Sequence, residues 1–464
     1  MVKLLNWNKL VVFSIWCLPV KIPETAPALL DLMQLLPEAL KLPAFEGVMY
    51  QPTVKDRYRH WSKLKHLTPP QGLTHQQWWL GLKLARMAGR KRLELRDVSG
   101  ANFSFVIPDA AQALLHELTM GLGGQIQLPE KVLNPHSRDQ YYISSLIEES
   151  ITSSQLEGAS TTRKVAEDML RSGRKPRSRS ELMIDNNYRA MRQVGEWIDK
   201  PLTPARILAL HRTIAAGTLE HEADEGRLRR ANESVAVYDN VSNLVVHQPP
   251  AAVELDARMA ALCKFANAQP VDPFIHPIIR AIILHFWLAY DHPFVDGNGR
   301  VARALFYWSL RRSGLWLGEF LSISNILVKA PAAYARAFLY SETDEGDLTY
   351  FLMHQLGVLK QATTALHRYI ARKIEQARQV ARNLTGMTAY NHRQRELLTH
   401  AIRHPSQEYT IRSHQASHGI AYETARTDLL QLARAGLLRQ SKRGHELMFL
   451  PAPDLESRLA QLPD

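Results

Sequence analysis

The chain has 464 residues, of which 45% are hydrophobic and 22% charged, so it is long enough for about three globular domains with apolar cores. Its formal net charge of +12 points to acidic partners, including nucleic acid, but the lysines and arginines are spread along the whole chain. The two cysteines, Cys17 and Cys263, exclude a disulfide framework and a Cys/His zinc site and suit a reducing compartment. We therefore expect a cytoplasmic protein.

The first residues carry a pattern that is also typical of a signal peptide. Lys3 and Lys9 precede an apolar run over residues 10–20, and small residues follow it. The run is too short to span a bilayer as a mature helix, so we expect no membrane partner. We interpret residues 1–40 as a poorly defined lead-in, loosely packed or partly helical, with secretion as the alternative.

Residues 41–130 form a predicted N-terminal extension whose pattern indicates no chemistry. Thr74 suits the N-cap of a helix, and Gly89 lies near the end of that helix. Further on, alternating apolar residues around a polar turn predict a small hairpin. In chain order we expect a helix over residues 73–90, a hairpin of residues 93–96 and 103–106, and a helix over residues 108–122.

Residues 141–158 predict an amphipathic helix with an unusual end. Apolar residues recur at helical spacing and form one packing stripe. Glu157 ends the helix beside Gly158, where a negative charge opposes the helix dipole. This placement predicts a cation partner from another part of the fold. The stripe consists of Ile143, Leu146, Ile147 and Ile151.

The most informative stretch lies between two predicted helices. An apolar run over residues 278–290 predicts a buried helix, and residues 301–311 predict an amphipathic one. Gly297, Asn298 and Gly299 between them should form the turn that opens the second helix. Backbone N–H groups at a helix N-terminus bind anions, and glycine lets the backbone approach a phosphate closely.

Charged residues around this turn complete a predicted site for a phosphorus-containing group. Arg300 and Arg303 lie on one helical face and can hold phosphate oxygens through bidentate contacts. Asp296 can hold a Mg²⁺ ion against a polyphosphate. His292 precedes the turn, and a histidine there suits removal of a hydroxyl proton. An ordinary polar loop between two helices is the alternative interpretation.

These residues match a known motif. The stretch from His292 to Arg303 resembles the signature of the Fic (Fic/Doc) family, His-x-Phe-x-Asp/Glu-Gly-Asn-Gly/Lys-Arg-x-x-Arg, with every fixed position present. The resemblance implies a Fic-type helical core and transfer of AMP from ATP to a Ser, Thr or Tyr hydroxyl of a target protein, with release of pyrophosphate. A Doc-type branch with Lys in place of Gly299 is associated with phosphate transfer, so Gly299 favours AMP transfer.

The same resemblance assigns roles to the motif residues. His292 would be the catalytic base, Asp296 the Mg²⁺ ligand, and Phe294 the anchor of the loop in the core. The residues that would bind the phosphates of ATP are Gly297, Asn298, Gly299, Arg300 and Arg303.

Residues 153–158 resemble the autoinhibitory motif of the family, Ser/Thr-x-x-x-Glu-Gly/Asn, with Ser153, Glu157 and Gly158 at its fixed positions. By this resemblance Glu157 pairs with Arg303 and keeps the γ-phosphate of ATP from its productive pose. Two alternatives stay open. Glu157 is a solvated carboxylate at a helix end, or it positions a water molecule that removes AMP from a modified protein.

A second predicted hairpin lies upstream of the motif. Residues 233–238 and 244–247 flank the polar turn 239–243. A plain structural hairpin is one interpretation. The family resemblance instead implies a β-hairpin flap that binds the target by strand addition, here through Val235, Val237 and Val245.

The last part of the chain, residues 385–455, resembles a winged helix-turn-helix domain. Because Glu423 and Asp428 lie among its basic residues, binding of duplex DNA and a protein-docking or dimerisation role both stay open. The expected elements are helices over residues 393–404, 410–418 and 422–435 and strands at 436–438 and 446–450. The residues that would contact DNA are Tyr422, Thr424, Arg426 and Thr427, with Lys442 and Arg443 in the wing.

Together these patterns predict a mainly α-helical protein with a Fic catalytic core over residues 131–375 and a C-terminal winged helix. The predicted function is that of a protein adenylyltransferase, a nucleotidyltransferase that uses ATP and Mg²⁺ and is autoinhibited by Glu157. The competing hypothesis is a DNA-binding regulator with a secondary Fic activity. The sequence allows a homodimer and does not name the target protein.

Overall fold

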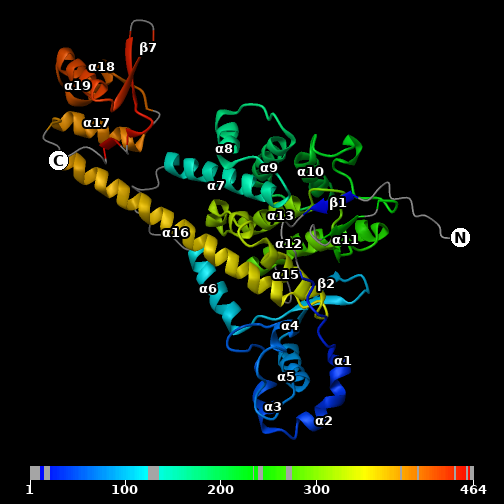
Figure 1. Cartoon of the computed structure of the whole chain (residues 1–464). Helices are drawn as coiled ribbons and strands as arrows, with labels where there is room; N and C mark the ends of the chain where they lie inside the picture. Colours follow the sequence, from blue (N-terminus) through cyan, green and yellow to red (C-terminus); the bar gives the residue numbers. More distant parts are fainter. Residues whose placement is uncertain are drawn as a thin grey trace. The chain divides into compact units, whose positions relative to one another are not determined.

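The computed structural model of the chain describes residues 11–14, 21–123, 135–233, 235–238, 244–267, 274–386, 389–404, 407–443, 446–455 and 458–459. The chain divides into two compact units, which are described separately. Residues 1–124 and 143–363 form the first unit, and residues 125–142 and 364–464 form the second. The described residues are mainly helical, which confirms the predicted fold class at this level (Figure 1). None of their helices combines the length and apolarity needed to cross a bilayer.

Two buried helices form the core of the first unit. Almost every side chain of α12 (Pro277–Asp291) and α13 (Asn298–Arg312) is buried, as expected for a helix that is covered on all sides. Aromatic side chains of neighbouring helices pack against Phe286 of α12. The Phe338 ring stacks on the Phe286 ring with centroids 5.1 Å apart, and the Phe351 ring meets it edge-on with centroids 5.2 Å apart. The helices around this pair include α9 (Arg179–Glu196), α10 (Pro204–Ala215), α11 (Leu255–Asn267) and α15 (Pro331–Glu342).

Helix α7 (Pro135–Leu156) contains the predicted amphipathic stripe. Leu146, Ile147 and Ile151 are buried, whereas Ile143 is 39% exposed. Ile147 and Ile151 belong to a cluster that also includes side chains of α8 (Arg163–Ser172) and α9. The other elements of this part of the chain are η2 (Glu222–Asp224), η3 (Ala252–Glu254), η4 (Trp316–Phe320), α14 (Ser324–Leu327) and α16 (Thr349–Gly386).

The N-terminal extension has its own apolar cluster. Its longest helix is α5 (His75–Ala88), which begins at Thr74 in a capping box with Gln77 and ends at Gly89, as the sequence predicts. The cluster also contains Ala26, Leu32 and Ala39, which come from the segment that we predicted as a lead-in. The further elements are α1 (Leu29–Leu32), η1 (Met33–Leu35), α2 (Leu36–Ala39), α3 (Pro43–Val48), α4 (Trp61–Leu64), the antiparallel strands β2 (Lys91–Arg96) and β3 (Asn102–Phe105), and α6 (Asp109–Gly123).

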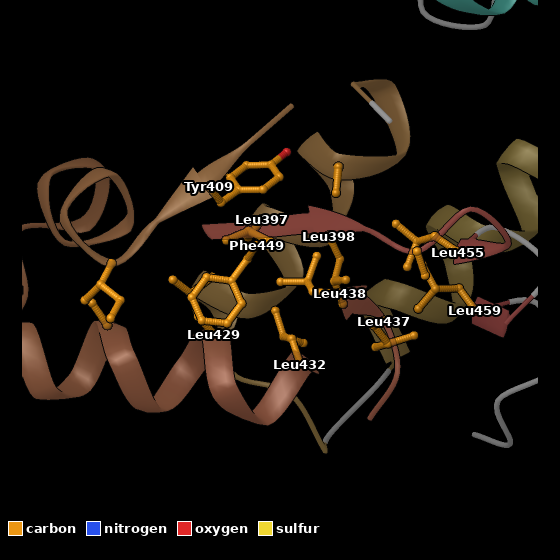
Figure 2. Packing of buried hydrophobic residues seen from close by; sticks show 14 residues of the cluster. Leu397, Leu398, Tyr409, Leu429, Leu432, Leu437, Leu438, Phe449, Leu455 and Leu459 are labelled. Atoms are coloured by element: carbon orange, nitrogen blue, oxygen red, sulfur yellow. The ribbon is translucent and has the colours of Figure 1, made fainter. Parts of the chain in front are cut away.

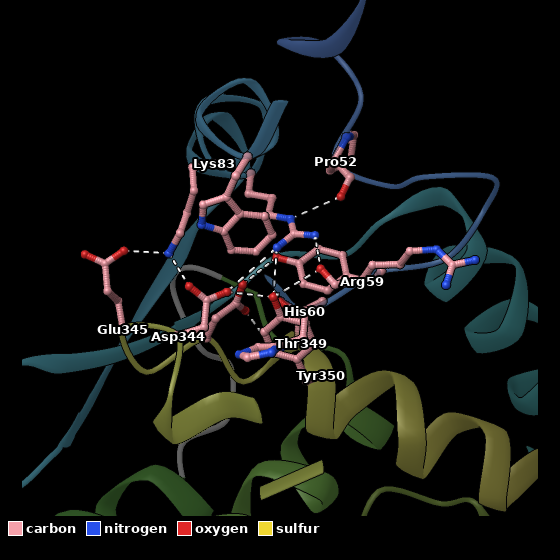
Figure 3. A network of polar contacts seen from close by, with 12 residues as sticks. Pro52, Arg59, His60, Lys83, Asp344, Glu345, Thr349 and Tyr350 are labelled. Carbon is pink, nitrogen blue, oxygen red and sulfur yellow. Dashed lines mark hydrogen bonds and ion pairs between the residues drawn. The ribbon is translucent and has the colours of Figure 1, made fainter. Parts of the chain in front are cut away.

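A buried polar network fastens α5 to the segment between α15 and α16 (Figure 3). Lys83 pairs with Asp344 and also with Glu345, at 2.5 Å. Arg86 donates to the Tyr350 hydroxyl at 2.9 Å, and that hydroxyl donates to Asp344 at 2.6 Å. Each of these buried charges therefore has a partner, which is the condition under which charges are tolerated in a core.

A small sheet has the strand order β1-β4-β5. Strands β4 (Val235–Tyr238) and β5 (Val245–His247) are antiparallel, and the turn predicted between them lies outside the described residues. Strand β1 (Val11–Ser14) pairs with β4 in parallel. The sequence does not predict this strand, because four residues without a partner in view carry no strand signal.

The second unit contains α17 (His392–Arg403), β6 (Tyr409–Thr410), α18 (Ile411–His418), α19 (Tyr422–Arg434), β7 (Leu438–Arg443) and β8 (Glu446–Pro451). The strands form an antiparallel sheet in the order β6-β8-β7. The strand predicted at residues 446–450 lies within β8, but the strand predicted at residues 436–438 shares only Leu438 with β7. Lys442 and Arg443 of the predicted wing lie at the end of β7. The sequence does not predict β6. Figure 2 shows the apolar core between the sheet and the helices, with Leu429 and Leu432 of α19 near Phe449 of β8.

Asp428 connects α17, α18 and α19. Its carboxylate accepts hydrogen bonds from Arg393 at 2.8 Å and from Asn391 at 2.7 Å, both at the start of α17. His414 of α18 lies 3.2 Å from the same carboxylate. Asp428 is buried, so it stabilises the core of the unit instead of opposing a phosphate at its surface.

Candidate active site

The motif loop, residues 292–297, connects α12 to α13 through two left-handed residues. His292 is the C-cap of α12 with a φ of 44°, a conformation that strains a non-glycine residue and recurs at functional sites. Gly297 has a φ of 84° and is the N-cap of α13. The predicted turn therefore lies at Gly297, while Asn298 and Gly299 already belong to the first turn of the helix.

The loop is closed by a clamp between Phe294 and Asn298. The Asn298 side chain accepts a hydrogen bond from the Phe294 N–H and donates one to the Phe294 carbonyl, both at 2.9 Å. The Phe294 ring is fully buried and stacks on the His211 ring, with centroids 3.8 Å apart. Phe294 lies in the core as predicted, and the Asn298 side chain shapes the loop.

Two residues outside the motif hold the loop backbone, and the sequence analysis missed both. His211 of α10 accepts a hydrogen bond from the Gly226 N–H at 3.0 Å and donates one to the Asp296 carbonyl at 2.9 Å. Burial lowers the pKa of His211 to about 4, so the ring is neutral. Arg229 donates from Nε to the His292 carbonyl at 2.9 Å. Neither residue stands in a pattern that separates it from ordinary helix and loop residues.

Arg300 is a buried guanidinium with unused donors. It is 1% exposed and donates one hydrogen bond, from Nη1 to the Ile214 carbonyl at 3.2 Å. Within the described part of the chain its Nε and Nη2 atoms have no hydrogen-bond partner, and the Asp296 carboxylate is 3.8 Å from Nη2. Burial also lowers the pKa of Arg300. A buried cation with open N–H groups at a helix N-terminus favours an anionic ligand.

Arg303 is paired as the sequence predicts. Its Nη2 atom donates to Oε1 of Glu157 at 2.8 Å and to the Ser153 carbonyl at 3.0 Å, and its Nε atom donates to the Ser153 hydroxyl at 2.8 Å. Burial would lower the pKa of Arg303, but the charge of Glu157 outweighs it and the pKa is raised. The carboxylate at the end of α7 is thus paired with a cation, which offsets its unfavourable place at a helix C-terminus.

Gly299 makes room for this pair. A Cβ atom on Gly299 would overlap Oε1 of Glu157 and would lie 3.0 Å from Nη1 of Arg303. The first turn of α13 can therefore approach the carboxylate only because residue 299 has no side chain.

Glu149 fixes α7 to the core at a point that the sequence analysis also missed. Its buried carboxylate accepts hydrogen bonds from the Tyr307 hydroxyl at 2.9 Å and from the Ser324 N–H at 3.1 Å. It also accepts one from the Ser322 hydroxyl at 3.0 Å. Burial raises the pKa of Glu149, and these donors oppose the rise. Glu157 therefore sits at the end of a helix that is held firmly in place.

The side chain of His292 is a buried, neutral imidazole. Its Nδ1 atom lies 3.2 Å from the Ala289 carbonyl, which places the ring proton on Nδ1 and makes Nε2 the basic nitrogen. Burial lowers the pKa of His292 to about 3, and the positive charge of His247 contributes. The ring is therefore neutral at physiological pH and can accept a proton.

A cavity with an empty volume of about 660 Å³ joins these groups. His292, Gly299, Arg303 and Glu157 line its polar part. Its remaining walls come from Val237, Val246 and His247 of the small sheet, Ala289 and Tyr290 of α12, and Tyr334, Ala335, Phe338, Leu339 and Glu342 of α15.

Comparison with known proteins assigns this region to a family. The model of the Fic/DOC family matches residues 201–310, which include α10, β4, β5, the motif loop and most of α13. The chain carries a Fic domain. In fold, the chain resembles a Fic family protein from Desulfovibrio desulfuricans G20, with a TM-score of 0.51 and 20% identity over 74% of this chain and 97% of that one.

Curated relatives match a part of the chain. One is the "Protein adenylyltransferase Fic" of Nematostella vectensis, which is 37% identical over 109 residues, or 23% of this chain and 22% of the relative. The protein of the same name from Drosophila melanogaster is 37% identical over 68 residues, or 15% of this chain and 14% of the relative. The chain thus spans less than a quarter of the length of these relatives.

Asp296 is the carboxylate of the Fic loop that can hold a metal ion. Its side chain is 17% exposed and lies 3.8 Å from both Arg179 and Arg300. Mg²⁺ is usually held by one or two carboxylates together with phosphate oxygens and water, so one carboxylate beside an anion site fits this ion. Among the described residues there is no cluster of three or more His, Cys, Asp or Glu side chains that would form a complete metal site.

The other predicted site residues lie in two different places. Val235 and Val237 of β4 are buried, Val237 in the cavity wall, whereas Val245 of β5 is 44% exposed. In the second unit, the predicted DNA-contacting residues are exposed at the start of α19. They are Tyr422, Thr424, Arg426 and Thr427.

Proposed function

We propose that the protein is a protein adenylyltransferase that transfers AMP from ATP to a Ser, Thr or Tyr hydroxyl of a target protein. One observation carries the proposal: a single cavity holds the neutral base His292, the N-terminal turn of α13 at Gly299, and the buried cation Arg303. A base and anion-binding donors in one cavity are the parts that nucleotidyl transfer needs. The similarity of the Fic domain to proteins named adenylyltransferases supports AMP as the transferred group.

In this proposal the nucleotide phosphates bind at the N-terminus of α13. The N–H groups of the first turn and the open donors of Arg300 would hold phosphate oxygens. The apolar wall of the cavity, with Val246 of β5 and Phe338 of α15, would hold the adenine ring. Asp296 would hold a Mg²⁺ ion, which when bound neutralises part of the phosphate charge.

The transfer step uses His292 as the base. The target hydroxyl gives its proton to Nε2 of His292, and the hydroxyl oxygen forms a bond to the α-phosphorus. The bond from that phosphorus to the bridging oxygen of pyrophosphate breaks, and pyrophosphate leaves with the electron pair. Backbone N–H groups of the first turn of α13 stabilise the negative charge that moves onto the phosphate oxygens.

Glu157 would restrain this reaction. Its carboxylate forms an ion pair with the guanidinium of Arg303, and the γ-phosphate of ATP would need the same guanidinium as its partner. The ion pair is nearly buried, so its attraction is weakly screened, and ATP must break it before binding productively.

Strands β4 and β5 would act as the flap that binds the target protein. A segment of the target would pair with a strand edge next to the cavity.

Two labelled forms of ATP test the proposal. The purified protein is incubated with cell extract and with ATP labelled either at the α-phosphate or at the γ-phosphate. Label from the α-position alone on extract proteins is the expected result. Label from the γ-position alone would show phosphate transfer and contradict the proposal, and the His292→Ala variant controls for other enzymes in the extract.

Two further functions have an observation in their favour. Glu157 lines the same cavity as His292, so it can also position a water molecule that removes AMP from a modified protein. The second unit exposes Tyr422, Thr424 and Arg426 at the start of a helix that follows another helix and a turn, an order typical of a winged helix that binds duplex DNA.

A further inference from the structure

His247, the last residue of β5, connects the small sheet to two helices of the Fic domain. Its Nδ1 atom lies 2.8 Å from Oε2 of Glu342 in α15, and its Nε2 atom lies 2.8 Å from the Tyr290 carbonyl in α12. The ring is 8% exposed and packs against the Tyr290 ring, with centroids 4.8 Å apart. Both ring nitrogens therefore face an oxygen atom that can only accept a hydrogen bond.

This geometry selects the charged form of the ring. A neutral imidazole has one N–H group and would leave a lone pair facing either the carbonyl or the carboxylate, whereas an imidazolium donates to both. Burial by itself would lower the pKa of His247, but Glu342, the Tyr290 carbonyl and Asp291 outweigh it and raise the pKa. The other groups nearby are His292, which is neutral, and Arg258, which is paired with Asp291 at 2.7 Å.

We propose that His247 is a positioning residue which, as an imidazolium bonded to Glu342 and to the Tyr290 carbonyl, fastens β5 to α15 and to the end of α12. The proposal rests on the proposed function for its effect on catalysis. Tyr290 lies two residues before His292, so the bond that holds β5 also fixes the last turn of the helix that presents the base.

The charge of His247 has a second effect, on His292. A positive neighbour disfavours protonation of a second imidazole in the same cavity. The surroundings of two titratable groups can give them different charge states and so different roles. Here the charged His247 would hold the structure, and the neutral His292 would accept a proton. Burial is the larger reason that the pKa of His292 is low, and the charge of His247 lowers it further.

The proposal predicts a dependence on pH with a definite sign. Because the pKa of His247 is raised in the folded protein, the fastening of β5 is complete below the ordinary histidine pKa and is lost as the pH rises through the raised value. Label transfer from α-labelled ATP should therefore fall on the alkaline side, together with a rise in KM for the target.

The Glu342→Gln variant tests the charge while keeping the shape. A glutamine still offers an oxygen to Nδ1 but removes the negative charge, so the alkaline midpoint should move down by about one pH unit or more. His247→Gln, which carries no charge at any pH, should lose this pH dependence and show a raised KM at all pH values. Glu94→Gln is the matched control, because Glu94 forms a 2.8 Å ion pair with Lys264 on the surface.

Hydrogen exchange gives a readout that does not require catalysis. The exchange of a peptide that covers residues 244–250 is measured by mass spectrometry between pH 6 and pH 10 and corrected for the intrinsic effect of pH, with about one-unit steps sufficient to resolve a titration. We expect protection of β5 to fall with rising pH, and at lower pH in Glu342→Gln than in the parent or in Glu94→Gln. Thermal melting confirms that each variant is folded.

The outcomes separate the two proposals. Exchange that follows pH as described, in a protein without any AMP transfer, would support the His247 bond and remove the proposed function. AMP transfer with superimposable pH profiles and exchange curves in the parent and Glu342→Gln would overturn the role of His247 and leave the proposed function standing.

Discussion

At the scale of single residues, His292 combines a strained backbone with a neutral, buried ring. We expect His292→Ala to lower label transfer about 10²–10⁴-fold, because His292 takes the hydroxyl proton in the proposed mechanism. Nucleotide binding should stay nearly intact, since α13 and Arg300 are unchanged. Asparagine tolerates the left-handed region, so His292→Asn is the better control for backbone strain. Transfer by either purified variant at the rate of the parent would remove His292 from its role.

The ion pair of Glu157 and Arg303 can be tested by variants of both residues. We expect Glu157→Gly to raise AMP transfer, including self-modification, because Arg303 becomes available to the γ-phosphate of ATP. Arg303→Ala should abolish the gain in the double variant. Transfer of α-label in the presence of Mg²⁺ is the measurement. A Glu157→Gly protein no more active than its parent would argue against inhibition, and loss of an ability to remove AMP would favour hydrolysis.

Gly299 gives a test of the same contact that does not depend on activity. In the Gly299→Ala variant the new methyl group would overlap the Glu157 carboxylate. Such overpacking lowers the free energy of unfolding by about 1–3 kcal/mol. We expect Gly299→Ala to lower the free energy of unfolding in the parent but much less in the Glu157→Gly background. Urea denaturation of the four proteins measures the coupling. Equal losses in both backgrounds would show that Glu157 does not occupy this position in solution.

At the scale of elements, β1 covers an edge that the proposed function would need. It pairs with β4 from Val11 opposite Val235 to Ser14 opposite Tyr238, and β5 covers the other edge of β4. A target strand that adds to β4 must first displace β1. We therefore expect deletion of residues 1–20 to raise the rate of label transfer to extract proteins several-fold. An unchanged rate, with unchanged melting, would place the target at the edge of β5 instead.

Some elements of the fold can be predicted from the local sequence, and others cannot. Helix α5 is predictable because a periodic apolar face lies between the Thr74 cap and Gly89, and the Fic loop because its residue types have no use in a core. The charge of Glu157 in an unfavourable place predicts that it has a cation partner, and the resemblance to the Fic family implies that this partner is Arg303. By contrast, Glu149 and Arg229 act through contacts with distant segments. The apolar stripe around Glu149 predicts a helix, but it does not predict that this carboxylate is buried. The two-residue strand β6 is likewise defined by its partner β8.

At the scale of the whole molecule, the second unit has a core of its own, which makes its activity separable from that of the Fic domain. AMP transfer needs residues of the first unit alone in the proposed mechanism. We therefore expect a chain that ends at residue 384 to keep AMP transfer to a small target, provided that its melting curve shows a folded protein. The fraction of α-label transferred per unit time, compared with the full chain, is the measurement. Loss of transfer in a folded truncated chain would show that the second unit takes part in catalysis.

We also expect residues 385–455 to bind duplex DNA independently of catalysis. Tyr422, Thr424 and Thr427 are exposed at the start of α19, and Arg426 is 47% exposed with Glu423 at 3.5 Å as its acidic neighbour. This surface ion pair is weak, so a DNA phosphate can replace the glutamate. Affinity should fall steeply with salt because phosphate contacts release counterions, and Arg426→Ala should weaken binding to all sequences alike. A gel-shift titration against genomic fragments and random duplex decides the matter: specific fragments bound no more tightly than random duplex would leave protein docking as the function of this unit.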